Sequence, residues 1–160
     1  MRAIPEGRLN KKITAVWRLS GILQTLIIGI IYFASGIPLA IFVGPKALFL
    51  GIAGGLTFLL LLLLVFIIPP IRYARWRYAV LDDEIDIYRG IIVRKRIIVP
   101  LVRVQYTDTS QGPFLRAMGL ASVNVSTAAG DESIPGLLLD DADALRDRVA
   151  ELAKQVHEDV

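Results

Sequence analysis

The chain has 160 residues, of which 54% are hydrophobic, and its mean hydropathy of +0.57 is far above that of an average soluble domain. It has no cysteine and one histidine, which excludes disulfide bonds, thiol chemistry and cysteine-based zinc sites. The length excludes a transporter built from two repeats of many helices. The net charge of +3 and the pI near 9.4 allow a polyanionic partner, so the position of the charges matters.

Two long stretches of the chain lack charge. Residues 19–45 hold no ionisable side chain except Tyr32, and residues 47–71 hold none. Each is long enough to cross a bilayer, because about 20 apolar residues span about 30 Å of hydrocarbon, and neither has the polar face of a soluble helix. The predicted parts are a basic cytoplasmic segment (1–18) and a two-helix transmembrane hairpin (19–71, with spans at about 17–37 and 47–70).

The connection between the two spans is predicted to be a short outer turn. Gly36, Pro38, Gly44 and Pro45 break the helical pattern there. Of nine basic residues that flank the spans, five precede the first and three follow the second, and only Lys46 lies in the connection. Because lysine and arginine accumulate on the cytoplasmic side, we expect both ends of the chain in the cytoplasm.

Aromatic and basic residues at the two cytoplasmic ends of the hairpin predict contact with lipid headgroups. Amphipathic rings settle at that depth, and basic side chains attract anionic lipids. The predicted membrane-interface residues are Trp17, Arg18, Arg72, Tyr73, Arg75, Trp76 and Arg77.

Small residues recur at four-residue spacing on both spans. They form one ridge of Gly21, Thr25 and Gly29 and another of Ala47, Gly51 and Gly55. Small residues let helices approach closely in lipid, where hydrophobic burial does not drive association. The spacing leaves open whether these ridges pack inside the hairpin or against another chain, and Gly51 and Gly55 are candidate partner-binding positions.

Gln24 is the strongly polar side chain at depth in the hairpin. It predicts a hydrogen bond from one helix to the other rather than a transport role. A conduction or proton pathway needs charged residues that face inward, and the two uncharged stretches supply none.

From residue 72 onward the pattern changes to short alternating runs that predict strands. Residues 85–89, 102–106 and 123–126 alternate apolar with polar side chains and are rich in β-branched residues. Turn residues separate about six strands, and 113–118 predicts one helical turn. The first strands are expected at 75–81, 84–89 and 91–99, with turns at 82–83 and 89–90, and the last at about 133–138.

A helix is predicted from about residue 141 to residue 157. Leu145, Val149, Leu152 and Val156 recur on one face, and acidic residues crowd the first turn. This apolar face against an antiparallel sheet gives a compact α+β domain over residues 72–160. The predicted core consists of Val80, Ile85, Ile87, Val102, Val104, Val123, Val125, Leu145, Val149 and Leu152.

An ordered series of motifs carries a family resemblance. The motifs occupy residues 72–78, 82–85, 89–90, 99–100, 103–105, 111–113, 116–120, 127–128 and 134–137. Together with the two preceding spans, they resemble the bacterial pleckstrin-homology-like domain of the YdbS type over residues 15–157. The resemblance implies an antiparallel, partly open barrel of six to seven strands closed by the C-terminal helix, in a multi-pass protein of the bacterial inner (plasma) membrane. It also implies a partner, a larger membrane protein with several copies of the same domain, and no catalytic residues.

The sequence favours neither an enzyme nor a nucleic-acid-binding protein. His157 stands near the end of the chain without a nucleophile, no phosphate-binding loop is present, and no cofactor is expected. Net charge is +4 over residues 1–18, +4 over 72–103 and −6 over 104–160, so the positive charge lies beside the membrane. The acidic turn at 82–84 argues against specific phosphoinositide recognition.

Two functional classes remain open from the sequence. The first is a non-enzymatic interaction module that holds or regulates a larger membrane assembly, linked to envelope integrity, with homo-oligomerisation as a further option. Its candidate contacts are Gly51, Gly55, Arg103, Gln105 and Arg116, although Arg103 and Gln105 could equally face solvent, and the basic run 94–96 could be ordinary strand charge or an anion site. The second is a lipid-handling protein with an apolar pocket between the barrel and the bilayer.

Overall fold

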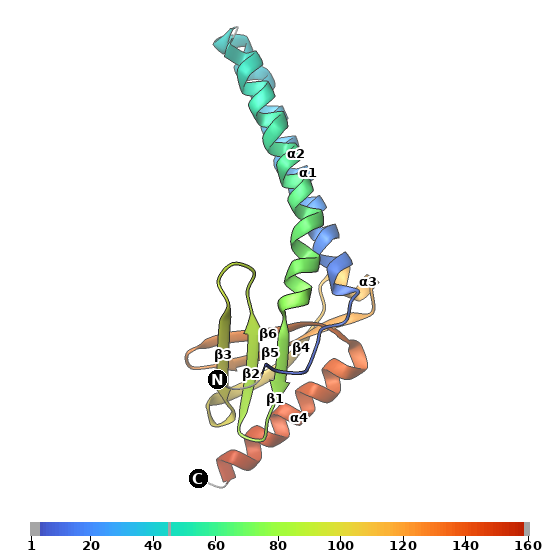
Figure 1. Cartoon of the computed structure of the whole chain (residues 1–160), viewed down its shortest axis with the longest axis vertical. Helices are drawn as coiled ribbons and strands as arrows, with labels where there is room; N and C mark the ends of the chain where they lie inside the picture. The colour runs from blue at the N-terminus through green and yellow to red at the C-terminus, as the bar shows by residue number, and fades with distance from the viewer. Residues whose placement is uncertain (1–3, 45, 159–160) are drawn as a thin grey trace. The chain divides into compact units, whose positions relative to one another are not determined.

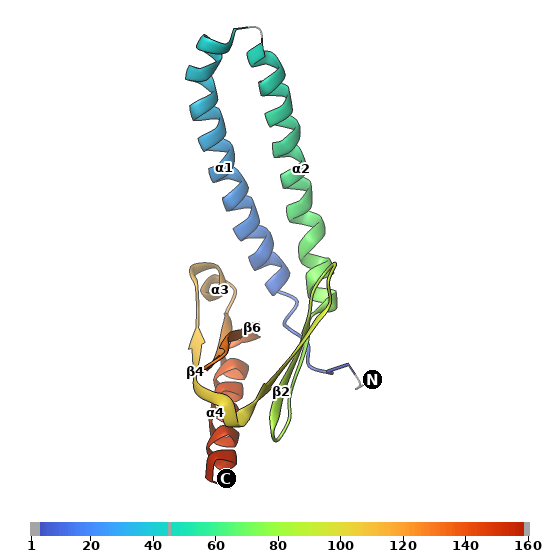
Figure 2. The ribbon, with the colours of Figure 1, turned by 90° about the vertical axis from the view of Figure 1, so that its left-hand side faces the viewer.

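The chain folds into two compact units, described here by a computed structural model of residues 4–44 and 46–158. Residues 17–70 form one unit. The described residues on either side of it, 4–16 and 71–158, form the other. Figures 1 and 2 show the helices of the first unit and the sheets of the second.

Two long helices make up the hairpin, as predicted. They are α1 (Ile13–Val43) and α2 (Lys46–Arg75). Within them, Ile13–Gly36 and Leu48–Arg75 are long and apolar enough to cross a membrane. Many of their large apolar side chains are exposed on the protein surface, which suits a hydrocarbon solvent.

Both helices run further than the sequence predicted. The expected break at Gly36 and Pro38 is wrong, because α1 continues through them to Val43. Gly44 then turns the chain with a φ of 64°, while Pro45 lies outside the described residues. The pair Pro69 and Pro70 lies inside α2. A proline removes one intrahelical hydrogen bond, but apolar surroundings preserve the rest because no water competes for them.

Six strands and a C-terminal helix form the domain, as predicted. The first antiparallel sheet consists of β1 (Arg77–Val80), β2 (Glu84–Arg89) and β3 (Lys95–Pro100), and the second of β4 (Val104–Ser110), β5 (Leu120–Thr127) and β6 (Gly130–Leu138). A 3-10 turn, η1 (Leu101–Arg103), joins the sheets, α3 (Pro113–Ala117) joins β4 to β5, and α4 (Leu139–Glu158) packs on the second sheet and on η1. The barrel is not closed, because within the described residues β3 does not pair with β4, nor β1 with β6.

The core between the sheets is filled by large apolar side chains. The most fully buried are Ile13, Ile85, Ile87, Leu101, Leu120, Ile134, Val123, Val125 and Val149. Among the predicted core residues, Val104 is also buried, whereas Val80, Leu145 and Leu152 are only half-buried. The prediction for Val102 is wrong: the side chain is 41% exposed, because it lies on η1, where Leu101 takes the inward position.

The turn between β2 and β3 is longer than predicted. The register pairs Arg89 with Lys95, so residues 90–94 form a loop and the expected strand at 91–99 begins four residues late. Gly90 starts the loop with a φ of 126°. A Cβ there would collide with the carbonyl oxygen of Val93, so the tight curve of the loop requires glycine.

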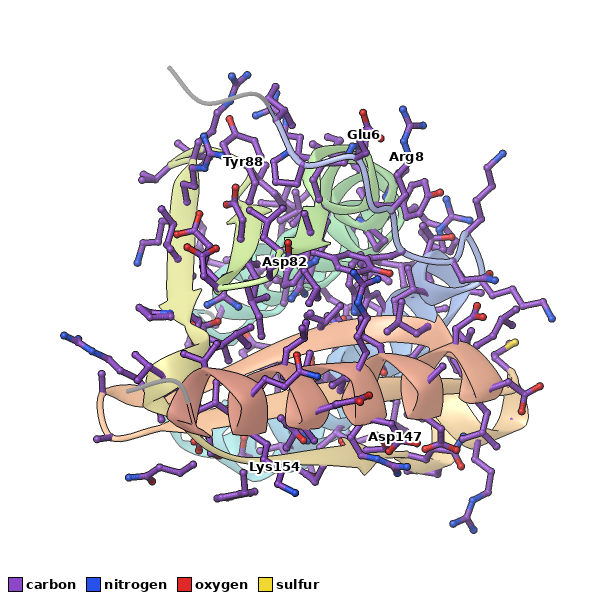
Figure 3. The ribbon with its side chains drawn as sticks, turned by 90° about the horizontal axis from the view of Figure 1, so that it is seen from below. Glu6, Arg8, Asp82, Tyr88, Asp147 and Lys154 are labelled. Atoms are coloured by element: carbon purple, nitrogen blue, oxygen red, sulfur yellow. The ribbon has the colours of Figure 1, made fainter. Side chains whose placement is uncertain are left out.

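The N-terminal segment links the edges of the two sheets. The sequence predicted only a basic segment here and gave no sign of this contact. Gly7 exchanges two backbone hydrogen bonds with Tyr78 of β1, at 3.0 and 3.1 Å. The N–H of Asn10 donates to the carbonyl oxygen of Gly136 in β6, at 2.9 Å. Figure 3 labels Glu6 and Arg8 along this segment. The first turn of α1 follows it into the domain, where Ile13 is buried.

Candidate functional site

The first small-residue ridge faces the inside of the hairpin. A Cβ added at Gly21 would lie 2.9 Å from the side chain of Val65, and one added at Gly29 would lie 2.7 Å from the ring of Phe58. Thr25, between them, is 5% exposed. The question that the spacing left open is therefore resolved for this ridge, which packs against α2.

The second ridge faces outward. Gly51 and Gly55 are exposed, and a Cβ at either position would meet nothing within 4 Å among the described residues. Gly54 is instead the glycine of α2 that faces α1, where the ring of Tyr32 covers it. The side chain of Ala47 lies outside the described part of the chain. Gly51 and Gly55 thus leave a G-x-x-x-G surface that the hairpin itself does not use.

Tyr32 supplies the hydrogen bond between the helices. Its hydroxyl donates to the carbonyl oxygen of Leu50 at 2.7 Å. The prediction that Gln24 would form such a bond is wrong, because its side chain is exposed on α1 and makes no hydrogen bond to a described residue. Beside Tyr32 an apolar cleft of about 240 Å³ separates the two helices, and its walls include Ile28 and Phe58.

The three polar candidates of the domain do not form one patch. Arg103 ends η1, and Gln105 lies where the register of β4 shifts between Val104 and Tyr106. Arg116 lies on α3, beyond the other end of β4 (Figure 2). All three are exposed, but the five residues of β4 that follow Gln105, which span about 17 Å, lie between the first two and the third. Arg103 and Gln105 therefore form one surface, which we call the η1–β4 corner, and Arg116 belongs to another.

Trp76 belongs to the core of the domain, so its predicted place among lipid headgroups is wrong. Its side chain is 3% exposed. The guanidinium carbons of Arg72 and Arg89 lie 5.8 and 5.5 Å from the centre of its ring, within the range of cation–π attraction. Arg89 also pairs with Glu132 of β6 at 3.0 Å. This cluster joins the last turn of α2 to both sheets and fixes the ring inside the fold.

The remaining predicted interface residues are accessible to different degrees. Arg72 and Arg75 are exposed, and the guanidinium of Arg75 donates a hydrogen bond to the carbonyl oxygen of Ile91. The half-buried ones are Trp17, Arg18, Tyr73 and Arg77. Their contact with headgroups stays a prediction.

An ion pair that sequence analysis missed divides the basic run 94–96. Asp86 is 3% exposed, and the Nε of Arg96 lies 3.0 and 3.1 Å from its two carboxylate oxygens. A buried carboxylate requires such a partner, so Arg96 has a structural role. The alternation of β2 pointed Asp86 outward, but Ile85, Asp86 and Ile87 are all buried, so side chains cover both faces of this strand. Arg94 and Lys95 remain as exposed cations.

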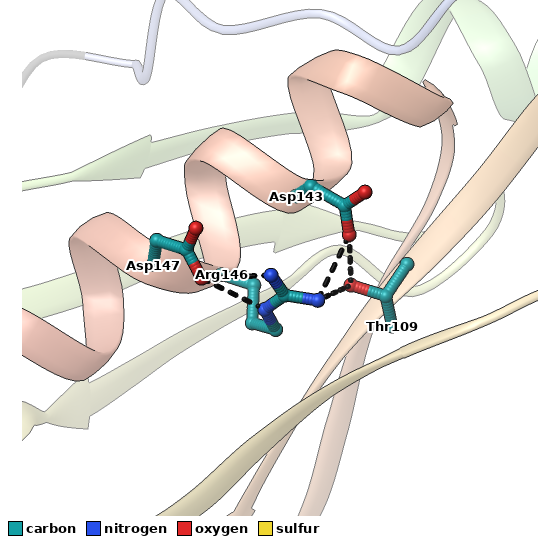
Figure 4. A network of polar contacts seen from close by, with 4 residues as sticks. All are labelled: Thr109, Asp143, Arg146 and Asp147. Carbon is teal, nitrogen blue, oxygen red and sulfur yellow. Dashed lines mark hydrogen bonds and ion pairs between the residues drawn. The ribbon is translucent and has the colours of Figure 1, made fainter.

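Polar side chains fix α4 on the second sheet. Figure 4 shows Arg146 between Asp143 and Asp147, with N–O distances of 2.9 and 2.8 Å. The hydroxyl of Thr109 in β4 donates to Asp143 at 3.2 Å. Asp143 and Arg146 therefore attach the helix to β4 through Thr109, whereas Asp147 pairs with Arg146 within the helix.

A polar groove lies between the N-terminal segment, β1 and α4. It has a volume of about 530 Å³, and Asn10, Tyr78, Asp141 and Arg148 are among the residues that line it. Burial raises the pKa of the Tyr78 phenol, and the negative charge of Asp141 raises it further. Tyr78 therefore remains neutral and can donate a hydrogen bond. The polar lining differs from the apolar pocket that lipid handling would require.

Two apolar helices, two three-stranded antiparallel sheets and a C-terminal helix define a membrane protein with a pleckstrin-homology-like domain. The chain belongs to the bacterial PH domain family, which matches it over residues 21–153. It is 42% identical to the UPF0699 transmembrane protein YdbS of Bacillus subtilis (strain 168) over 160 residues, the full length of both chains. No solved structure matches the chain. The family and fold expected from the sequence motifs are thereby confirmed.

Proposed function

We propose that the chain is a non-enzymatic, membrane-anchored module that binds or regulates a larger membrane protein assembly which supports envelope integrity. The observation that carries this proposal is the outward position of Gly51 and Gly55 on α2. Exposed glycines one turn apart let a second helix approach closely, and close approach is the main source of association energy in lipid. The partner is a membrane protein with further copies of the same domain, or a second copy of this chain.

The domain supports this proposal with a polar contact surface and a filled interior. Arg103 and Gln105 are exposed at the η1–β4 corner, where they can contact a protein without cost to the core. Acidic residues such as Asp86 and Asp143 are engaged in ion pairs, which suits a binding role better than acid–base chemistry.

The proposed topology is a multi-pass protein of the inner (plasma) membrane with both ends in the cytoplasm. The proposal rests on the distribution of the nine basic residues that flank the spans. Eight of them lie outside the connection between the spans and only Lys46 lies within it, and basic residues accumulate on the cytoplasmic side. Reporter fusions at residue 46 and at residue 160 test it. A cytoplasmic signal from the fusion at residue 160 is expected, and an extracytoplasmic signal there would overturn the topology.

Affinity capture of the full chain in mild detergent, followed by mass spectrometry, tests the module. Gly55→Leu adds bulk to the outward ridge, and Arg103→Glu reverses a charge at the corner. Each should reduce the yield of a membrane protein partner about tenfold, which corresponds to about 1.4 kcal/mol. Ala34→Leu is the matched control, because it adds bulk at an exposed position of α1 and should leave the yield unchanged. Equal yields from all variants would contradict the proposal.

Lipid handling is the second candidate, and the apolar cleft beside Tyr32 is the observation that favours it. An acyl chain in that cleft would remain bound through purification. If the wild-type chain captures no protein and carries one lipid per molecule, the lipid-handling function replaces the interaction module.

A further inference from the structure

The loop between β2 and β3 presents a highly exposed apolar tip. Ile92 is 94% exposed and Val93 is 69% exposed. Ile92 is thus more accessible than Phe49, at 76%, in the second span. Isolated apolar residues on a surface are ordinary, but two adjacent ones at the end of a hairpin form a small apolar patch that water does not favour.

The chain topology places this tip at the end of the first sheet where β1 begins, directly after the last turn of α2. β1 begins at Arg77, two residues after α2 ends, and β2 runs antiparallel to it with Tyr88 opposite Arg77. The loop therefore lies at the end of the sheet where the chain leaves α2 (Figure 1). The hydrogen bond from Arg75 to the carbonyl oxygen of Ile91 ties the loop to the last turn of that helix.

Charge also distinguishes the two ends of this sheet. Arg94 and Lys95 are exposed directly after the apolar tip, whereas Asp82 and Asp83 are exposed in the turn at the opposite end. Arg96 is held by Asp86 and does not belong to the exposed pair. An anionic membrane surface attracts the cationic end and repels the acidic end, so the charges favour the same orientation as the topology.

We propose that residues 91–95 form a membrane-inserting loop. The side chains of Ile92 and Val93 enter the boundary between headgroups and acyl chains, about 5–10 Å deep, as the apolar faces of interfacial segments do. Arg94 and Lys95 bind the phosphates of anionic headgroups. The loop is a second attachment of the domain to the bilayer, besides the spans, and it restrains how the domain can rotate. This inference is independent of the proposed function, since either an interaction module or a lipid-handling protein could use it.

The absence of cysteine from the chain makes a site-specific probe straightforward. The full chain carrying Ile92→Cys is labelled with the environment-sensitive dye NBD and placed, one chain per disc, in nanodiscs of phosphatidylcholine and phosphatidylglycerol at about 3:1. Asp82→Cys is the matched control, because it places the same dye in an exposed turn at the other end of the same sheet.

The dye at residue 92 should emit at shorter wavelength than the dye at residue 82, and spin labels on the acyl chains should quench it about threefold more strongly. Apart from the scaffold protein at its rim, each disc contains one chain and lipid, so no partner protein can shield the dye. Equal emission and quenching at the two positions would overturn the insertion.

The headgroup contacts have their own measurement. Replacing Arg94 and Lys95 by glutamine should move the emission from residue 92 toward that of residue 82 in discs with phosphatidylglycerol, and should change it little in phosphatidylcholine alone. An unchanged emission in the anionic discs would overturn the role of these two cations. Ile92 contributes little to the core, so a thermal transition that matches the wild type verifies that each labelled chain is folded.

Discussion

The hairpin and the domain bury opposite kinds of residue. In the domain the largest fully buried side chains are apolar, with Ile85 and Val149 both at 0% exposure. In the hairpin the large apolar side chains face outward, with Ile30 at 67% exposure, and small residues such as Thr25 and Gly29 lie inside. The solvent explains the difference. Water drives apolar side chains into the interior of the domain, whereas hydrocarbon does not, so close packing and hydrogen bonds hold the helices of the hairpin together.

The largest effect should come from a charge in the domain core. Val149→Asp places a carboxylate at a fully buried position of α4 and should destabilise the domain by about 3–5 kcal/mol. Ala150→Asp adds the same charge to the exposed neighbour and should cost little. Thermal unfolding of the full chain in detergent, followed by tryptophan fluorescence, measures both. Equal stability of the two variants would show that α4 does not dock on the sheets.

The apolar pattern predicted most of this core for a physical reason. Alternation reports which side chains face inward in strands, and it placed Ile85, Ile87, Val123 and Val125 correctly. It failed at Val102, because a single 3-10 turn shifts the phase of the pattern. It also could not show that Gly7 pairs with Tyr78, since a contact across 71 positions of the chain leaves no periodic signal.

A smaller effect should come from the contact between the N-terminal segment and β6. Gly136 has a φ of 69°, and a Cβ there would lie 2.6 Å from Ile13. Gly136→Ala should therefore destabilise the domain by about 1–3 kcal/mol for overpacking, in addition to about 1 kcal/mol for the left-handed backbone. Gly119→Ala should lose only the stability that the left-handed backbone costs, because Gly119 has a φ of 66° and open space around it.

The difference between the two alanine variants in thermal unfolding isolates the contact with Ile13. A clear excess for Gly136→Ala would show that the N-terminal segment is part of the domain core. Equal losses of stability would show that this segment is not part of the domain core, as the boundary predicted from the sequence implies.

Two adjacent glycines of α2 distinguish the inner face of the hairpin from its outer face. Gly54→Ala would place a Cβ against the ring of Tyr32, whereas Gly55→Ala would meet nothing within 4 Å. The first variant should weaken packing of α1 on α2 by about 1–3 kcal/mol, and the second should not. The rate of cross-linking between cysteines introduced at Ile28 and Leu61, which both line the cleft, measures the packing in nanodiscs.

Equal cross-linking rates in the two glycine variants would contradict the orientation of α2. The sequence could not decide this orientation, because a four-residue spacing is the same on every face of a helix. Gly51 and Gly55 match the motif, yet Gly54, one residue and about 100° away, is the position that faces α1. Only the partner across the hairpin, Tyr32, distinguishes these faces, and the motif contains no information about it.

The smallest effect should come from the hydrogen bond between the helices. Tyr32→Phe removes the hydroxyl that donates to the carbonyl oxygen of Leu50 and keeps the ring over Gly54. Cross-helix hydrogen bonds in membranes contribute about 0.6 kcal/mol on average, because the separated helices also find partners, so the variant should lose about that much packing energy. Isotope-edited infrared spectroscopy of the Leu50 carbonyl detects the bond directly, and its stretching band should move to higher frequency. Tyr106→Phe, which removes an exposed hydroxyl from the domain, should leave the band in place. If the band is identical in the wild type and in Tyr32→Phe, the Tyr32 hydroxyl does not bind this carbonyl group, and close packing alone holds the two helices together. The contrast between the hairpin and the domain would then depend only on the glycines inside the hairpin.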